Sequence, residues 1–383
     1  MLKLLSFTSL FSVFFFTTGL YRSIPVNANI TYLIFSIIHI PLILIVGKNS
    51  IKSVNTINFL FLNFIFLFYM SITYVAISFN NVYAFPLLLN HFYCFVIMIL
   101  LSLSFESNVA RDFYEKLNKT ILFTVVFCSL FNFYEAFILG AGNANTGVIG
   151  RADGFFFNPN QSSQMLLLLT ALILPNYQKI GFKIPQSIFM LIVFLGIIST
   201  FSKAGVISYI IILAYIFFKP KSLSIINKSI IMLFIFIVLQ NFQSIIYYLE
   251  FTELIGQNSL NRIAFNEQTD SFSTRLDVFT YGFESFKNSP IFGSGIGYNY
   301  IWSLGYGSHN IYLFYLLDMG IIGLLLLCLM LYILFDSNNL LFFIVVSLLG
   351  FFSHNLMSQV EVYVALSIYL FLSYFNNKNT IGT

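Results

Sequence analysis

Long apolar segments alternate with short polar connections along almost the whole chain. A helix that crosses a bilayer needs about 20 mostly apolar residues, and somewhat fewer when polar residues bound it. On this rule the pattern predicts an all-α polytopic membrane protein with about twelve transmembrane helices, and we interpret residues 1–383 as a single membrane domain. The predicted spans are approximately 4–21, 29–47, 57–79, 82–105, 119–140, 162–176, 186–202, 204–218, 229–248, 309–335, 339–355 and 360–375.

Composition agrees with this pattern. Apolar residues make up 58% of the chain and charged residues 8%, against roughly 25% charged in an ordinary soluble domain. So few polar groups could not cover the surface of a soluble globule, which excludes a soluble enzyme, a disordered chain and a nucleic-acid-binding protein. The three cysteines fall inside apolar segments, and we interpret them as lipid- or core-facing. The first segment follows Lys3 as in a signal peptide, but no small-x-small cleavage site precedes Tyr21, so we expect a span.

Basic residues in the connections predict the orientation. With the N-terminus inside, twelve Lys and Arg residues lie on the cytoplasmic side and six lie outside, so we expect both termini to be cytoplasmic. Eleven of the thirteen lysines lie inside, whereas four of the five arginines lie outside. Because Arg binds phosphates and carboxylates through paired hydrogen bonds, this bias favours an anionic ligand on the outer face. Ion pairs within the outer loops are the alternative.

Two connections are long, and both are predicted to face outside. They cover residues 141–161 and about 249–308. Long loops in compact domains are often binding loops or lids. In the second loop, residues 274–287 carry apolar side chains at helical spacing, which predicts an amphipathic helix capped by Ser273 or Thr274 and facing lipid or the bundle. A glycine-rich segment follows at 290–297; glycines allow a close approach to a ligand, but we favour a plain turn here.

Several polar residues stand at predicted helix ends on the outer side. His309 and His354 each lie between a Ser and an Asn, at the outer ends of spans 309–335 and 339–355. A structural and a functional role are both open for these histidines. Glu135 and Asp318 are ionisable groups within spans, and such groups are functional candidates by default. Glu135 could equally form a buried ion pair with Arg151. We interpret His39 and His91, which lie in mid-span, as structural residues that link helices.

These residues fit one kind of chemistry. The chain contains no Asp-x-Asp, His-Glu-x-x-His or Gly-x-Ser-x-Gly motif. A diphosphate leaving group would therefore be stabilised by fixed cations, for which Arg275, Arg151 and Lys203 are candidates. Nearby positive charge would keep His309 neutral, and a neutral imidazole can accept a proton from an attacking hydroxyl. Since the outer face lacks nucleotide sugars, an activated donor there is expected to be linked to a lipid.

Four segments resemble the bacterial O-antigen polymerases and O-antigen ligases. Gly154-Phe-Phe-Phe-Asn-Pro-Asn-Gln161 is similar to the family's outer-loop signature, and Thr200-Phe-Ser-Lys203 to its Thr-x-Ser-Arg turn. Arg275 followed by Pro290-x-x-Gly-x-Gly-x-Gly297 resembles a third motif. His309-Asn310, nine residues and Gly320-Ile-Ile-Gly323 resemble a fourth. The likeness covers about residues 150–325.

The resemblance implies a metal-independent, inverting glycosyltransferase of the GT-C type, with no cofactor and no metal site. Its donor would be a glycan on undecaprenyl diphosphate, bound by basic residues at the positions of Lys203 and Arg275. Lys203 stands where the family usually has Arg; it keeps the charge but lacks the bidentate fork. His309 would activate the acceptor hydroxyl. Further expected substrate-binding residues are Arg151, Asn160 and Asn310, and secondary candidates are His354, Glu135, Asp318 and Arg262.

Two activities within the family remain open. A polymerase moves the growing lipid-linked chain onto the next lipid-linked repeat unit, and a ligase moves the finished chain onto lipid A-core. We favour the polymerase, in the bacterial inner membrane with the active site facing the periplasm and with a chain-length regulator protein as a possible partner. The alternative from another class is a lipid-linked oligosaccharide flippase. It would be expected to carry charges deep within the bundle and repeat symmetry between its halves, and we find neither pattern.

Overall fold

The computed structural model describes most of the predicted helices. The described residues are 1–46, 51–108, 110–139, 151–181, 184–218, 271–302, 308–336, 339–353 and 355–381, with five isolated positions between 226 and 240. The predicted span 229–248 and residues 141–150, 249–270 and 303–307 of the two outer loops lie outside this part of the chain, the isolated positions aside.

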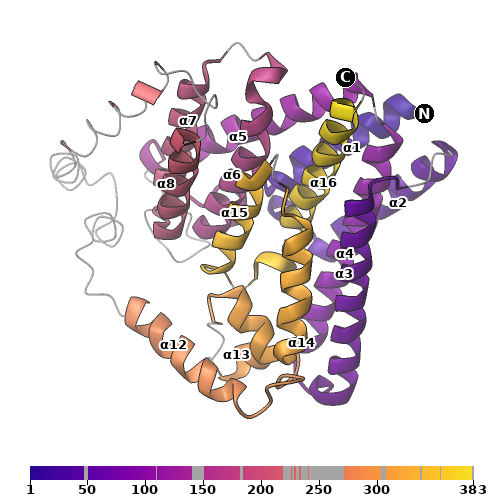
Figure 1. Cartoon of the computed structure of the whole chain (residues 1–383), viewed down its shortest axis with the longest axis vertical. Helices are drawn as coiled ribbons and strands as arrows, with labels where there is room; N and C mark the ends of the chain where they lie inside the picture. Colours follow the sequence, from indigo (N-terminus) through magenta and orange to yellow (C-terminus); the bar gives the residue numbers. More distant parts are fainter. Residues whose placement is uncertain are drawn as a thin grey trace. The chain divides into compact units, whose positions relative to one another are not determined.

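All regular elements in the described ranges are helical, which confirms the all-α class (Figure 1). Among the described residues, five helices are long and apolar enough by length and composition to cross a membrane: α2, α3 with its π-helical extension η2, α4, α5 and α14, the last of which is interrupted at Gly320. The α-helices are α1 (Leu2–Thr17), α2 (Ala28–Val46), α3 (Val54–Thr73), α4 (Ala84–Ser107), α5 (Arg111–Phe137), α6 (Pro159–Ile173), α7 (Gln186–Ser199), α8 (Lys203–Phe218), α12 (Ser271–Phe286), α13 (Tyr298–Trp302), α14 (Ile311–Ile333), α15 (Leu340–Gly350) and α16 (Val360–Ile381). Short 3-10 or π turns are η1 (Leu20–Ser23), η2 (Tyr74–Ser78), η3 (Gly154–Phe156), η4 (Leu174–Ile180) and η6 (Leu356–Ser358).

The chain forms two compact units. Unit 1 contains residues 1–12, 26–114 and 269–383, and unit 2 contains residues 13–25 and 115–268. The boundaries fall inside α1 and α5. That the whole chain is one membrane domain stays a prediction, and each unit is described here by itself.

Unit 1 is built around α4, which packs against α2, α3 and α16, while α14 packs along α3. Polar side chains connect the helices inside this apolar bundle. The Tyr315 hydroxyl lies 2.8 Å from Nε2 of His91, and Asn63 Nδ2 donates to the Tyr363 hydroxyl at 3.2 Å. The expected linking role of His91 is therefore confirmed. His39 is buried as well, but its ring bonds within its own helix, to the Phe35 carbonyl.

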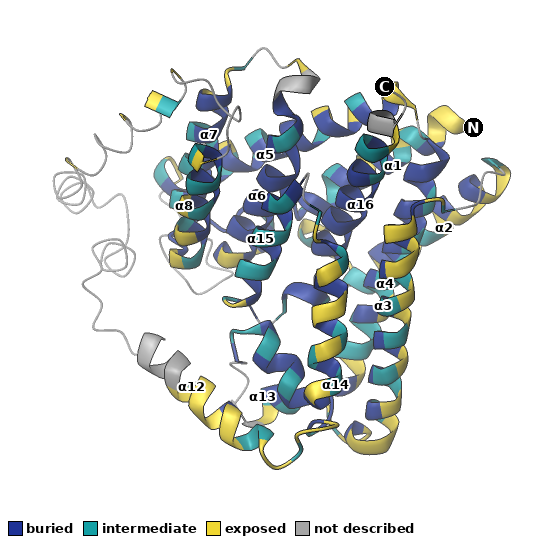
Figure 2. Ribbon diagram, in the orientation of Figure 1, coloured by how far each residue is buried: buried dark blue, intermediate teal, exposed yellow. Residues whose placement is uncertain are grey.

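Unit 2 has α6 at its centre, in contact with α7 and α8. Nearly every residue of α6 is buried, whereas α3 in unit 1 shows a row of exposed apolar side chains (Figure 2). A close helix crossing occurs where Gly196 of α7 faces Ser129 of α5, because a Cβ atom at Gly196 would lie 2.5 Å from the Ser129 Cα. An exposed apolar surface is expected on a helix that faces lipid.

Several predicted spans differ from the structure. The helices at four of them, α1, α6, α7 and α8, have only 14 to 16 residues. The span predicted at 309–335 is not continuous, because Gly320 has φ 67° and ψ −163°, which interrupts α14 between two helical segments. The span predicted at 339–355 ends at Gly350, so α15 has 11 residues and a length of about 16 Å. A length of that order is too short to cross a hydrocarbon layer of about 30 Å. Hydropathy reveals apolar length but not a glycine-dependent break inside it.

Candidate functional site

In unit 1 the glycine-rich loop lies directly against the break in α14. The amides of Ser294 and Gly295 donate to the carbonyls of Leu317 and Asp318, at 2.8 and 3.0 Å. The Ile321 amide donates to the Pro290 carbonyl at 2.9 Å. The glycine break frees these backbone groups from the helix ladder, and the loop satisfies them. Two segments that resemble separate motifs of the family therefore form one structure, which we call the loop–helix corner (residues 290–299 and 317–321).

Glycine is needed on both sides of the corner. A Cβ atom at Gly293, whose φ is +77°, would lie 2.5 Å from the backbone of Asp318, Met319 and Gly320. A Cβ atom at Gly320 would overlap the Ile291 carbonyl. Since two backbones meet here without room for side chains, the glycines serve backbone-to-backbone packing as well as turn geometry.

Asp318 adds a side-chain anchor to the corner. Its carboxylate is buried and accepts hydrogen bonds from the Gly297 amide at 2.7 Å and the Asn299 amide at 2.9 Å. A buried carboxylate is costly unless it is hydrogen-bonded, and these two amides supply that compensation. Asp318, a secondary candidate from the sequence, thus lies in the corner and binds the loop.

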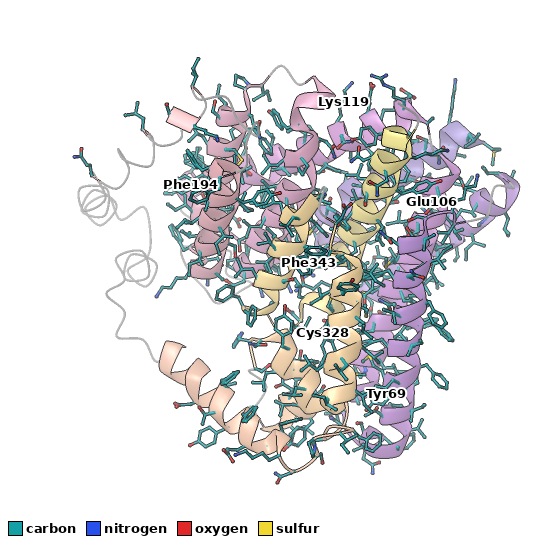
Figure 3. The ribbon with its side chains drawn as sticks, viewed as in Figure 1. Tyr69, Glu106, Lys119, Phe194, Cys328 and Phe343 are labelled. Atoms are coloured by element: carbon teal, nitrogen blue, oxygen red, sulfur yellow. The ribbon has the colours of Figure 1, made fainter. Side chains whose placement is uncertain are left out.

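Helix α3 and its connection to α4 also bind the corner. The Tyr69 hydroxyl, on α3 and labelled in Figure 3, donates to the Met319 carbonyl at 3.0 Å. Asn81, in the connection between α3 and α4, donates from Nδ2 to the Ile296 carbonyl at 2.7 Å. Sequence reasoning did not single out either residue. Both donate to carbonyls exposed by irregular backbone, which a sequence pattern does not reveal.

The amphipathic helix is present as α12, which contacts α14. It begins at Ser271, so Ser273 and Thr274 lie within the helix and the expected cap at one of them is wrong. Phe279 and Phe283 are exposed on α12, as are Asp277 and Glu284, and the expected contact of its apolar face with lipid stays a prediction (Figure 2). Arg275 lies in the first half of α12; its side chain is outside the described part of the structure.

The His309-Asn310 pair precedes α14. Asn310 is the N-cap, and its Oδ1 accepts hydrogen bonds from the amides of Tyr312 and Leu313 at 2.9 and 3.1 Å. His309 is half-buried, and its φ of +50° places it in the left-handed region. Such a conformation is uncommon outside glycine and fixes the direction from which the imidazole leaves the backbone.

The first segment of α14 runs toward the 79–83 connection. Tyr315 packs edge-on against Phe66 of α3, with ring centroids 5.0 Å apart. Three residues further along α3, Tyr69 bonds to Met319, so both segments run in the same direction. The N-terminal end of α14, with His309, therefore lies nearer the middle of α3 than the loop–helix corner does. The sequence predicted a continuous span with His309 at its outer mouth; the break at Gly320 overturns the continuity, whereas the position of His309 at the outer face stays a prediction.

The second segment of α14 runs back along unit 1. The Leu334 carbonyl accepts a hydrogen bond from the Tyr369 hydroxyl at 2.6 Å, and Asp336 accepts one from Ser373 at 2.6 Å. Close by on α16, Phe371 packs against Phe105 near the end of α4. That end of α4 is opposite the 79–83 connection, so the chain reverses direction at Gly320 (Figure 1).

The end of α15 lies beside the start of α14. The Tyr312 hydroxyl donates to the Ser347 carbonyl at 2.8 Å, and a Cβ atom at Gly350 would lie 2.8 Å from Ile311. The polar segment after α15 is folded on Asn355, whose Oδ1 accepts from Ser353 and Gln359, both at 2.9 Å. The end of α15 is therefore next to the start of α14; His354 lies outside the described residues, and the expectation that both histidines lie on the outer face stays a prediction.

Unit 2 positions Arg151 and Asn160 together. The Arg151 Nε donates to the Thr200 carbonyl at 2.9 Å, and one terminal guanidinium nitrogen donates to Asn160 Oδ1 at 3.2 Å. Arg151 is buried, whereas Asn160 is exposed at the start of α6. Asn158 is the N-cap of α6 and accepts from the amides of Asn160 and Gln161. The outer-loop signature is therefore a helix start held by a buried arginine.

Glu135 also holds this loop. Its Oε2 accepts hydrogen bonds from the amides of Asp153 and Gly154, at 3.1 and 2.8 Å. Gly154 has φ +58°, and a Cβ there would lie 2.8 Å from the Asn132 amide oxygen. Glu135 thus binds the same loop as the arginine that the sequence suggested as its partner.

Lys203 is the first residue of α8 and its side chain is exposed. The preceding turn is fixed by Ser202, whose hydroxyl accepts a hydrogen bond from the Gly205 amide at 3.2 Å, and by Phe201, whose φ is +47°. The Thr-x-Ser-Lys segment is therefore a helix start that presents a cation. Arg262, the remaining secondary candidate, lies outside the described residues.

The helices and the polar loops define a multi-pass membrane protein whose irregular, polar segments gather at helix ends and at the break in α14. Residues 188–328 match the family model described as O-antigen ligase, which confirms the resemblance to O-antigen polymerases and ligases. The match includes Lys203, α12, the loop–helix corner and His309. A comparison with curated proteins finds no match.

Asn310 provides a test of the described cap. Replacing Asn310 with Ala removes the acceptor for two amides and should cost about 1 kcal/mol of stability, whereas Asn310→Asp keeps the acceptor and should be close to neutral. Thermal unfolding of the purified proteins in detergent measures the difference. An Ala variant as stable as the wild type would contradict the capping role. An Asp variant that is stable but inactive would support the substrate-binding role expected from the sequence.

Proposed function

We propose that this protein is a membrane glycosyltransferase that polymerises oligosaccharide repeat units linked to undecaprenyl diphosphate. The reaction occurs at the periplasmic face of a bacterial inner membrane, without a metal and with inversion at the anomeric carbon. The family match over 188–328 carries this proposal, because it includes the candidate base, a candidate diphosphate ligand and the corner that joins their helices.

His309 is proposed to be the general base. The acceptor hydroxyl oxygen attacks the anomeric carbon of the donor, its proton passes to the imidazole, and the bond from that carbon to the diphosphate oxygen breaks. The lipid diphosphate leaves with the bonding electron pair. The half-buried position of His309 next to the capped start of α14 supports this role, since a general base must be held within hydrogen-bond reach of the hydroxyl.

Arg275 is proposed to bind the diphosphate through paired hydrogen bonds, and Lys203 to add a second positive charge. A diphosphate that leaves develops negative charge, and fixed cations stabilise it without any reorganisation at the moment of reaction. The exposure of Lys203 at a helix start supports its role. Arg151 and Asn160, in unit 2, and Asn310, in unit 1, are also proposed to contact the substrate.

The remaining features belong to the same proposal. We propose twelve spans in a GT-C-like arrangement, both termini in the cytoplasm, and lipid-linked glycans as donor and acceptor. A chain-length regulator protein would act with the enzyme. The second candidate is an O-antigen ligase, which the description of the matched family favours. Both activities use the same donor and differ in the acceptor.

Surface polysaccharide from a strain that lacks the gene distinguishes these activities. Loss of a polymerase should leave core carrying one repeat unit, whereas loss of a ligase should leave bare core while lipid-linked polymer accumulates. Gel electrophoresis of the polysaccharide, with and without a plasmid copy of the gene, makes the measurement. Accumulation of single units on the cytoplasmic face would contradict both activities and indicate a flippase.

His309→Ala should abolish chain extension, because the variant lacks the imidazole proposed to accept the hydroxyl proton, while membrane insertion stays normal. A complementation assay measures extension, and immunoblotting of membranes measures insertion. Ser104→Ala, which removes a buried hydroxyl that donates to the Leu100 carbonyl within α4, is a control for nonspecific damage to unit 1 and should remain active. Wild-type extension by His309→Ala would show that the base is a different residue.

Arg275→Ala should be nearly inactive and Arg275→Lys partly active, since Lys keeps the positive charge but loses the planar pair of donors. Initial rates with a purified lipid-linked donor give the comparison. A loss of about 2–3 kcal/mol in transition-state stabilisation is the order expected for one charged hydrogen-bonding group. Equal rates for the two variants would exclude the paired contact with diphosphate.

A further inference from the structure

The segment from α12 to α13 is held together by local hydrogen bonds. After α12 ends, the amides of Lys287, Asn288 and Ser289 each donate to the carbonyl three residues earlier, at 3.1 to 3.2 Å. The Ser285 hydroxyl of α12 lies 2.8 Å from the Tyr298 hydroxyl of α13. A movement of the loop would therefore be transmitted to α12, the helix that contains Arg275.

The loop is in turn attached to α14 next to its break at Gly320, mainly through backbone hydrogen bonds. The Asp318 side chain adds two further hydrogen bonds there. Its two carboxylate oxygens are bonded to two different amides, those of Gly297 and Asn299, one on each side of Tyr298. Nine residues before Asp318 stands His309, at the start of the same helical segment. Asp318 thus joins α14, which His309 precedes, to the loop that follows α12, the helix of Arg275.

We propose that Asp318 is a positioning residue. It fixes the glycine-rich loop to α14 next to the break at Gly320 and thereby keeps α12, with Arg275, at a fixed position relative to His309. This inference rests on the proposed function and deepens it. Asp318 contacts backbone amides of the protein itself and need not contact substrate. Losing its two bonds should let α12 shift, and a misplacement of about 1 Å in a catalytic group can cost about a hundredfold in rate.

Asp318→Asn is the sharpest substitution. The side chain keeps its shape and one oxygen acceptor, but its NH2 group would face an amide that also donates, so one of the two bonds becomes repulsive. The matched control is Glu106→Gln. Glu106 is likewise buried in unit 1 and accepts from two backbone amides, those of Lys52 and Ser53, but it lies at the opposite end of α4 from the corner.

Hydrogen–deuterium exchange of the full-length protein in lipid nanodiscs tests the anchor without reference to activity. Asp318→Asn should increase exchange in peptides that cover 293–302 and leave α4 and α16 at wild-type levels. Glu106→Gln should increase exchange only around 52–56. Unchanged exchange at 293–302 in Asp318→Asn would overturn the anchor. If that variant does not accumulate in membranes, Asp318→Ser, which keeps one acceptor and leaves room for water, is expected to give the same increase, and no increase would overturn the anchor.

Activity then tests positioning. Asp318→Asn should lower turnover by about ten- to a hundredfold with a smaller change in KM, and Glu106→Gln should stay within about twofold of wild type. In an Arg275→Lys background, Asp318→Asn should cost much less than it does alone, because the geometry it protects is already lost. Losses that multiply, or wild-type turnover despite raised exchange, would overturn the positioning role. An Arg275→Lys variant with full activity would instead count against the proposed function, whatever the exchange data show.

Discussion

The described part of unit 1 depends on a close approach of two backbones, where the glycine-rich loop meets the break in α14. Gly293 and Gly320 leave no space for a Cβ atom, and the amides and carbonyls of the two segments satisfy each other. Irregular backbone at membrane depth is tolerated only where it is buried against protein or lines a cavity. The corner meets this requirement, and it brings the loop that follows α12 to the helical segment that begins after His309.

Buried carboxylates that bind backbone amides recur in this chain, which has few charged residues. Among the described residues, Glu106, Glu135 and Asp318 are buried carboxylates that each accept hydrogen bonds from two backbone amides of a loop. A hydrogen bond to a charged group contributes about 1.5–3 kcal/mol, roughly twice as much as a neutral one. Such a carboxylate therefore holds a loop at a helix end with one side chain. Binding a loop in this way explains why these three acidic residues lie within apolar helices.

The sequence predicted the helical class and most helix positions, because apolar length and polar boundaries are local properties. It did not predict the reversal of α14: the stretch 311–333 is apolar on both sides of Gly320, and only the contact with Ile291 explains the break. The supporting contacts of Tyr69 and Asn81 were missed for a related reason, because they bind carbonyls that become available only once the backbone has left the helix. The hydrogen bond between Arg151 and Asn160 was not predicted, because it joins residues whose distance is known only in three dimensions.

The central claim of the proposal is that Arg275 on α12 and His309 before α14 act at one site, where Arg275 binds the donor's lipid diphosphate and His309 lies within reach of the reacting groups. A photoreactive polyprenyl diphosphate, with the reactive group next to the diphosphate, tests it most directly when it is bound to the full-length protein in nanodiscs and the labelled peptides are identified by mass spectrometry. The account predicts labelling of peptides that contain Arg275 and His309, and competition by unlabelled lipid diphosphate. Competed labelling confined to other helices, with both of these peptides unmodified, would contradict it.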